Sequence, residues 1–216
     1  MKVLYFMTSA NMGGVERLFY NTVSHIENRS DIKFACFYPP LSHDIIELFR
    51  VKNVVCFNRK RHPAIQKYLY YHWVAFFRFV GYLSQENITI IHVHEAFSML
   101  LSLCAKAFKR VKLVRTHHGA NRYYYSFVNA IFRLACKQID LNIFVSDTFR
   151  DEFMAINRIA SKSFPSAVVY NGVVVANDIV STKLRQFDED SCKLIMVGNY
   201  TAARDHLFVV KALYRL

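Results

Sequence analysis

The chain has 216 residues, of which 53% are hydrophobic and 20% are charged, and its formal net charge is +12. A chain of this length and apolar content can bury a core, so the composition excludes an intrinsically disordered protein. The densest apolar stretch, residues 73–80, is interrupted by Arg78 and is far shorter than the roughly 20 residues that cross a bilayer, so no membrane-spanning helix is expected.

The five cysteines are odd in number, widely spaced and embedded in apolar runs. They are Cys36, Cys56, Cys104, Cys136 and Cys192. This pattern favours reduced core thiols over disulfides or a zinc site and indicates a cytoplasmic protein. The apolar residues 3–7 are too few for the core of a secretory signal, which agrees with that location.

Short apolar or β-branched runs alternate along the chain with longer amphipathic stretches. The expected strands cover residues 2–8, 32–38, 53–57, 88–94, 111–118, 141–146 and 166–171. The expected helices cover residues 14–27, 43–51, 63–85, 96–109, 123–138 and 147–157. Strands that are apolar at nearly every position, separated by helical lengths, are typical of a parallel sheet with helices on both faces. The sequence therefore predicts an α/β fold with a doubly wound parallel sheet.

The last forty residues differ in character from the rest. Residues 176–191 lose the apolar period and gain acids, which indicates a linker. Residues 192–216 then restart as one strand and one helix, too few elements to bury the two faces of a sheet. We expect an N-terminal domain at 1–175, a linker at 176–191, and the first βα unit of a second, truncated domain at 192–216.

Gly13 and Gly14 lie between the first expected strand and the first expected helix. In open α/β sheets, ligands bind beyond the carboxyl ends of the strands, where such loops meet helix N-termini. A residue without a Cβ lets backbone N–H groups approach a ligand, and the positive end of the helix favours phosphate or another anion. The dinucleotide-binding fingerprint is not matched, because a third glycine is missing. The alternative is a tight turn, with Glu16 stabilising the start of the helix.

Four histidines and one acid follow two of the expected strands. His92, His94 and Glu95 end the fourth strand, and His117 and His118 end the fifth. Alternation along a strand places His92 and His94 on one face. All five residues are expected to gather at the sheet edge that also holds the glycine pair, which indicates a functional site. The alternatives are a half-buried structural role for His92 and a zinc site, for which no recognisable ligand set is present.

Residues 48–139 contain fifteen Lys or Arg residues but only two acids, Glu86 and Glu95. Such a face attracts anionic lipid, nucleic acid or a phosphorylated substrate, although a solvated basic surface is the simpler alternative. Within it, residues 58–83 combine a basic start with many aromatics and no acid, which suits docking at an anionic membrane surface. A core-packing helix fits that pattern equally well. No nucleic-acid-binding motif accompanies the charge, so nucleic acid is not an expected partner.

Six short segments of the chain form an ordered set. They read MGGVERL, IIHVHEA, LVRTHHG, LNIFVSDTFRDEF, VVYNGV and LIMVGNYTAARDHLFVVKAL. In this order and at this spacing they resemble retaining glycosyltransferases of family 4, and the resemblance covers the whole chain. It implies a GT-B architecture, of which the chain would form the Rossmann-like N-terminal domain and the start of the C-terminal one. It also implies sugar transfer from a nucleotide sugar to a glycan or lipid-linked acceptor, with retention of the anomeric configuration.

The resemblance also implies roles for individual residues. His118 matches the histidine near the reacting face of the sugar and is the candidate catalytic residue. The candidate acceptor-binding residues are Gly13, Gly14, His94, Glu95 and Asn121, and the candidate donor-binding residues are Gly14, Ser146, Asn171, Gly172, Asn199 and Arg204. Asn199 and Arg204 stand where family members often carry Arg and Lys, so one charge facing the leaving diphosphate is missing. Neither a metal nor a cofactor besides the nucleotide-sugar substrate is expected.

The leading expectation is a transferase fragment with little or no activity alone, from a cytoplasmic or peripheral membrane enzyme of polysaccharide biosynthesis. Its expected partners are a nucleotide sugar, the acceptor, an anionic membrane surface at residues 58–83, and a second copy bound through the unfinished C-terminal end. The alternatives are the non-catalytic half of a split transferase, a nucleic-acid-binding module and a nucleotide-sugar epimerase.

Overall fold

The computed structural model describes residues 1–9, 14–26, 29–40, 43–58, 65–118, 134–159, 164–172 and 210–212. The chain divides into two compact units, Met1–Gly172 and Val173–Leu216. Described residues of the second unit are limited to 210–212, which are helical. The linker predicted at 176–191, and almost all of the βα unit predicted at 192–216, lie outside the described residues and stay predictions.

The first unit is built on one seven-stranded parallel sheet. Its strands are β1 (Val3–Met7), β2 (Ile32–Cys36), β3 (Val55–Cys56), β4 (Ile90–Val93), β5 (Lys112–His117), β6 (Leu141–Phe144) and β7 (Ser166–Val168). They lie in the order β3-β2-β1-β4-β5-β6-β7, and every neighbouring pair is parallel. The predicted α/β class and doubly wound sheet are confirmed. The order reverses between β1 and β4, which makes this pair the topological switch point where such sheets bind ligands.

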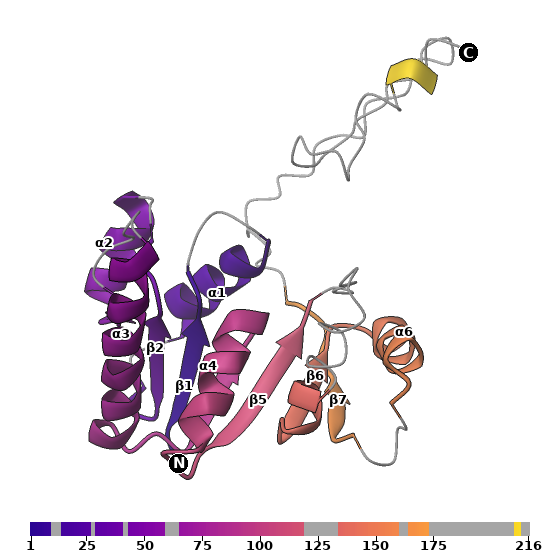
Figure 1. Ribbon diagram of the computed structural model, residues 1–216. Coiled ribbons are helices and arrows are strands. Elements are labelled where there is room, and N and C mark those ends of the chain that lie inside the picture. Colours follow the sequence, from indigo (N-terminus) through magenta and orange to yellow (C-terminus); the bar gives the residue numbers. More distant parts are fainter. Residues whose placement is uncertain are drawn as a thin grey trace. The chain divides into compact units, whose positions relative to one another are not determined.

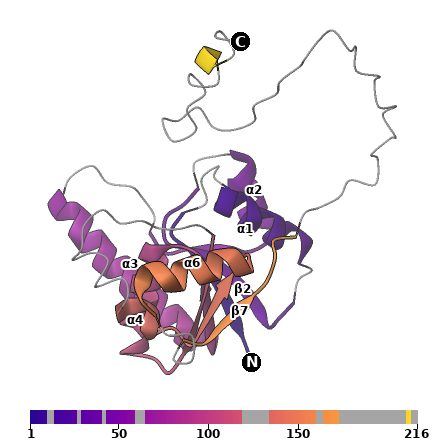
Figure 2. The same ribbon diagram turned by 90° about the vertical axis from the view of Figure 1, so that its right-hand side faces the viewer.

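The helices follow the strands as the hydrophobic periodicity predicts. They are α1 (Gly14–His25), α2 (His43–Val51), α3 (Ile65–Gln85), α4 (Ala96–Lys106) and α6 (Asp147–Asn157). Figure 1 shows the strands side by side, and the turned view in Figure 2 shows helices on both sides of the sheet. None of the described helices is long and apolar enough to cross a membrane.

Alternation along β1 divides the core between the two faces of the sheet. Leu4 and Phe6 belong to the larger apolar cluster, in which Phe6 stacks on Phe79 of α3 at 4.4 Å between ring centroids. Met7 belongs to a smaller cluster with side chains of α1 and α2, and half-buried Tyr5 packs against it. The sheet is therefore covered on both faces, which explains why its strands read as nearly continuous apolar runs.

Candidate functional site

Four rings line one face of the sheet across β1, β4 and β5, and we call them the histidine stack: Tyr5, His92, His94 and His118. The register places Tyr5 beside His92, and their ring centroids lie 4.7 Å apart. His92 stacks on His94 at 4.8 Å, as the alternation predicts, and His94 stacks on His118 at 5.1 Å. The stack therefore runs from the middle of the sheet to its carboxyl edge, at the switch point.

One hydrogen bond connects His92 of the histidine stack to β5, and another joins His94 to His118. Nε2 of His92 lies 2.8 Å from Oγ1 of Thr116, and Nδ1 of His94 lies 2.8 Å from Nε2 of His118. Thr116 and His118 project to the same face of β5 because they are two residues apart. His94 and His118 are thus paired with each other, and His92 is paired with the hydroxyl of Thr116.

Burial sets the charge state of these imidazoles. It lowers the pKa of His92 to about 4 and the pKa of His94 well below its usual range. The pKa of His118 is also lowered, first by burial and then by the nearby cation of Arg115. At neutral pH the three rings are therefore uncharged, and each carries one N–H donor and one acceptor nitrogen.

Glu95 joins the two strands of the switch point. It is the residue before α4, but its side chain does not cap that helix. Instead its Oε2 accepts a hydrogen bond of 2.6 Å from the backbone N–H of Thr8, just beyond β1. Burial raises the pKa of Glu95, and the charge of Glu16 on α1 raises it further.

Gly14 is the first residue of α1, and Gly13 lies outside the described residues. A Cβ built on Gly14 would meet no described atom within 4 Å, and the residue does not have a positive φ. Neither crowding nor turn geometry in the described structure therefore requires glycine at position 14. The turn that the tight-turn alternative concerns includes residues 10–13, which lie outside the described residues, and Glu16 lies in the first turn of α1 as that alternative expects.

The expectation that all four histidines gather at one site is wrong for His117. His117 points to the opposite face of the sheet from its neighbour His118 and is 3% exposed. Its Nε2 lies 2.9 Å from Oδ1 of the buried Asn142, and its ring stacks on Phe144 at 4.7 Å. Burial, followed by the charge of Arg115, lowers its pKa to about 3. His117 is therefore a neutral core residue, because successive residues of a strand face opposite sides.

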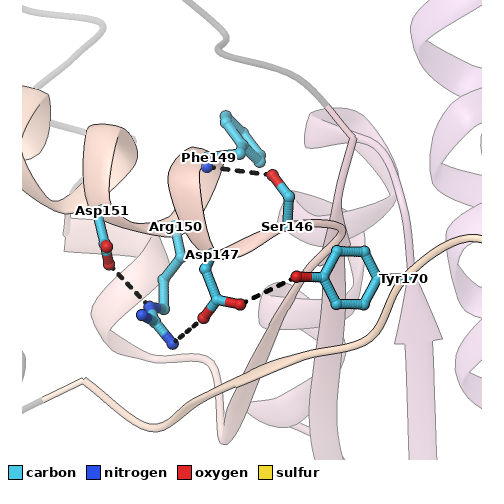
Figure 3. A network of polar contacts seen from close by, with 6 residues as sticks. All are labelled: Ser146, Asp147, Phe149, Arg150, Asp151 and Tyr170. Atoms are coloured by element: carbon cyan, nitrogen blue, oxygen red, sulfur yellow. Dashed lines mark hydrogen bonds and ion pairs between the residues drawn. The ribbon is translucent and has the colours of Figure 1, made fainter.

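Ser146 follows β6 and begins α6, as Figure 3 shows. Its Oγ accepts a hydrogen bond of 3.2 Å from the backbone N–H of Phe149, so the serine caps the helix. Asp147 forms an ion pair of 3.0 Å with Arg150 and accepts a hydrogen bond of 3.1 Å from the hydroxyl of Tyr170. Sequence reasoning missed this cap, although a serine followed by an acid at a helix start is a recognisable signal.

The predicted site residues fall into three groups. His94, Glu95, His118 and Gly14 lie beyond or near the carboxyl ends of β1, β4 and β5. Ser146, Asn171 and Gly172 follow β6 and β7, further along the same edge. Gly13, Asn121, Asn199 and Arg204 lie outside the described residues. Sequence reasoning missed Tyr5, Thr8 and Thr116, since their part in the site depends on strand order and register.

No cluster of three or more His, Cys, Asp or Glu side chains in the described ranges could hold a metal ion. The four described cysteines, at 36, 56, 104 and 136, are free thiols. Burial raises the pKa of Cys56 and of Cys136 to about 11, so both are protonated at neutral pH.

Helix α3 has two different faces. Ala75, Phe79 and Leu83 are buried in the larger core cluster, as the core-packing interpretation of residues 58–83 predicts. Trp73 and Phe77, however, are 60% and 54% exposed, and their rings stack at 6.2 Å. The helix therefore packs against the core and also presents aromatic side chains to solvent.

The model of the family described as glycosyltransferase family 4 matches residues 12–177. No curated protein gives a significant match to the chain. Solved structures that share its fold include Anabaena Alr3699/HepE in complex with UDP (17% identity, TM-score 0.57, 80% of this chain and 44% of that one), a Rickettsia africae glycosyltransferase (13%, 0.54, 80% and 43%) and Thermosynechococcus elongatus sucrose-phosphate synthase (9%, 0.50, 79% and 48%). The chain spans less than half the length of each.

Proposed function

The chain belongs to glycosyltransferase family 4, and from this premise we propose that it supplies the acceptor-side domain of a sugar transferase. The donor would be a nucleotide sugar and the acceptor a glycan or a lipid-linked sugar, with retention of the anomeric configuration. The observation that carries the proposal is the meeting of His94, Glu95 and His118 at the carboxyl edge of the switch-point strands.

The neutral imidazole of His118 suits contact with a sugar hydroxyl. Departure of a nucleoside diphosphate places negative charge on the leaving group and positive character on the sugar. An uncharged ring can hydrogen-bond a hydroxyl without adding a positive charge next to the developing cation. Helix α6 begins at the edge where the strands end, so its positive end favours the anionic leaving group.

Several residues complete this proposal from further along the chain. Ser146, Asn171 and Gly172 would lie on the donor side, although the hydroxyl of Ser146 also caps α6. Asn199 and Arg204 would face the diphosphate, where the guanidinium of Arg204 can form a charge-assisted bond. Gly13 and Asn121 would contact the acceptor together with Gly14. No metal takes part in this proposed step.

The proposal is tested first by NMR titration of the ¹⁵N-labelled chain with oligosaccharides, short-chain lipid-linked sugars and UDP. Acceptor sugars should shift the backbone signals of Thr8, His94 and His118. The variant His118→Asn should weaken binding, whereas His25→Asn, at an exposed position of α1, should leave it unchanged. Shifts confined to surfaces away from these residues for every acceptor would contradict the proposed acceptor site.

Catalysis is tested with a panel of nucleotide sugars. The donor is expected to be held mainly by residues beyond this chain, so the 216-residue chain alone should transfer little or no sugar. Rapid turnover by the purified chain would contradict the division into acceptor and donor halves. Loss of transfer in His118→Asn, within a polypeptide that also contains the donor half, would support the catalytic assignment.

The proposed enzyme works at an anionic membrane surface and faces the cytoplasm, in the synthesis of a polysaccharide. Residues 58–64 and α3 support this part of the proposal through their basic start and the exposed rings of Trp73 and Phe77. The chain should float with liposomes that contain phosphatidylglycerol but not with pure phosphatidylcholine. A Trp73→Ser/Phe77→Ser double variant should lose flotation, and Ile156→Ser on α6 should keep it.

Self-association through residues 192–216 is a separate part of the proposal. The strand and helix predicted at residues 192–216 carry apolar side chains that a second copy could cover. Sedimentation velocity should give a concentration-dependent dimer for the whole chain and a monomer for residues 1–175. A monomer in both would contradict it.

A further inference from the structure

The hydrogen bond between His94 and His118 uses one named nitrogen of each ring. Nδ1 of His94 and Nε2 of His118 are 2.8 Å apart. A hydrogen bond needs one donor and one acceptor, so a single proton lies between these two nitrogens. Either His94 donates and His118 carries its own proton on Nδ1, or His118 donates from Nε2 and its Nδ1 is an acceptor. In both cases Nε2 of His118 is engaged.

The engagement of Nε2 leaves Nδ1 as the nitrogen of His118 that a ligand can reach. Among the described residues, Nδ1 of His118 has no hydrogen-bond partner. The residue stands just beyond β5, at the carboxyl edge, and its ring is only half-buried. The pairing therefore determines which nitrogen faces the site.

His94 is itself held in place from the far side of the stack. Its ring lies on that of His92 at 4.8 Å and near that of Tyr5 at 6.4 Å. His92 is in turn fixed by its 2.8 Å hydrogen bond to Thr116. A ring packed on one side and hydrogen-bonded on the other has few rotamers available, so it can orient its partner.

We propose that His94 is a positioning residue, which fixes the ring orientation and the tautomer of His118 so that Nδ1 of His118 faces the substrate. This inference rests on the proposed function, in which His118 contacts a sugar hydroxyl. It differs from the role that the sequence predicts for His94, because His94 acts through His118 and not by contacting the acceptor.

Two substitutions at His94 separate the hydrogen bond from the ring. In His94→Phe the ring stays and the nitrogen is lost. In His94→Asn the ring is lost, but the side-chain amide occupies nearly the position of Nδ1 and can still bond to Nε2 of His118. His25→Phe on the exposed surface of α1 is the matched control. Backbone NMR spectra establish that each variant is folded.

The first measurement is the tautomer of His118, from ¹⁵N imidazole spectra of the chain assigned with His118→Gln. The wild type and His94→Asn should show one tautomer with a hydrogen-bonded Nε2. His94→Phe should show nitrogen shifts averaged over both tautomers, since the hydrogen bond to Nε2 of His118 is then lost. Unchanged His118 signals in His94→Phe would overturn the proposal, as would averaged signals in the wild type.

The second measurement is sugar transfer by a polypeptide that contains this chain and the donor half. His94→Phe should lower kcat by about tenfold to a hundredfold, because a misplaced catalytic group loses its alignment. KM for the acceptor should change by less than about threefold, and His94→Asn should recover most of kcat. A rise in KM with kcat unchanged would overturn the positioning role in favour of direct acceptor binding. Absence of transfer by the wild type would contradict the proposed function, and the tautomer measurement would then decide the pairing by itself.

Discussion

The two faces of β5 place neighbouring histidines in different surroundings. His117 faces the larger core cluster. There its Nε2 hydrogen-bonds to the side chain of Asn142, and its ring stacks on Phe144. His118, its neighbour in the chain, faces the histidine stack and bonds to another histidine at the open edge. Whether a histidine of this strand is enclosed by the core or lies beside the histidine stack depends on the face it occupies, and a one-residue step along a strand changes that face.

The two sides of β5 differ in how far the polar atoms of their histidines are paired within the protein. On the closed side, the buried amide of Asn142 hydrogen-bonds to His117 and to the carbonyl of Pro165, and the ring of His117 stacks on Phe144. On the open side, the pairing of two imidazoles satisfies one nitrogen of His118 and leaves the other at the edge. The closed side contributes stability, and the open side is where the proposed function places the sugar acceptor.

Acidification should produce the largest effect and tests whether both sides hold neutral imidazoles. The folded-state pKa values are about 4 for His92 and about 3 for His117, below the unfolded value. The contribution of the two neutral imidazoles to the free energy of unfolding is therefore fully present above pH 6.5 and is lost as the pH falls towards the folded-state pKa values. At pH 5 the loss is about 2 kcal/mol per imidazole, or about 4 kcal/mol for the two. Urea unfolding at pH 8 and pH 5 measures it.

A variant separates the two contributions to the acid effect. His92→Gln should reduce the difference in unfolding free energy between pH 8 and pH 5 by about 2 kcal/mol, because His94, His117 and His118, whose pKa values are also lowered, still titrate. The raised pKa of Glu95 works in the opposite direction, since protonation relieves the cost of burying its charge. A stability that does not change between pH 8 and pH 5 would contradict the neutral, buried state of these rings.

Truncation of the two neighbouring histidines compares the sides directly. His117→Ala should cost about 3 kcal/mol, because it leaves a cavity against Phe144 and removes the partner of a buried amide oxygen. His118→Ala should cost about 1 kcal/mol, the net value of one hydrogen bond at a half-buried position. Thermal and urea unfolding give both values. Equal costs would contradict the distinction between a closed and an open side.

Ser146→Ala tests whether the hydroxyl of Ser146, at the same edge of the sheet, has a structural role. Loss of the helix cap should destabilise the chain by about 1 kcal/mol, as removal of serine caps generally does. Thr148→Ala, at an exposed position in the first turn of the same helix, is the matched control and should have a smaller effect. A stability equal to that of wild type would mean that the hydroxyl is free for a ligand.

Tyr170→Phe should have the smallest effect. The variant removes one exposed hydrogen bond to Asp147, so the free energy of unfolding should stay close to that of wild type. Urea unfolding of this variant sets an upper limit on the stability that an exposed contact beside α6 contributes. A loss of stability as large as that of His117→Ala would show that the contacts around α6 belong to the core and not to the exposed surface.

Much of the fold could be predicted from the sequence, because continuous apolar runs and helical periods are local signals. Alternation correctly placed His92 and His94 on one face. The same rule separates His117 from His118, but grouping by sheet edge alone hid that separation. The partners Asn142, Thr116 and Thr8 could not be found, since they depend on which strands are neighbours and in what register.

The bond between Glu95 and Thr8 has a consequence for what can bind at the end of β1. A carboxylate already occupies the backbone amide that an incoming anion would seek there, and Glu16 adds a second acid nearby. A diphosphate would be repelled from this corner, whereas uncharged hydroxyls could donate hydrogen bonds to the carboxylate. The two acids thus act as an electrostatic filter that, under the proposed function, reserves the corner for the sugar acceptor and turns the nucleotide elsewhere.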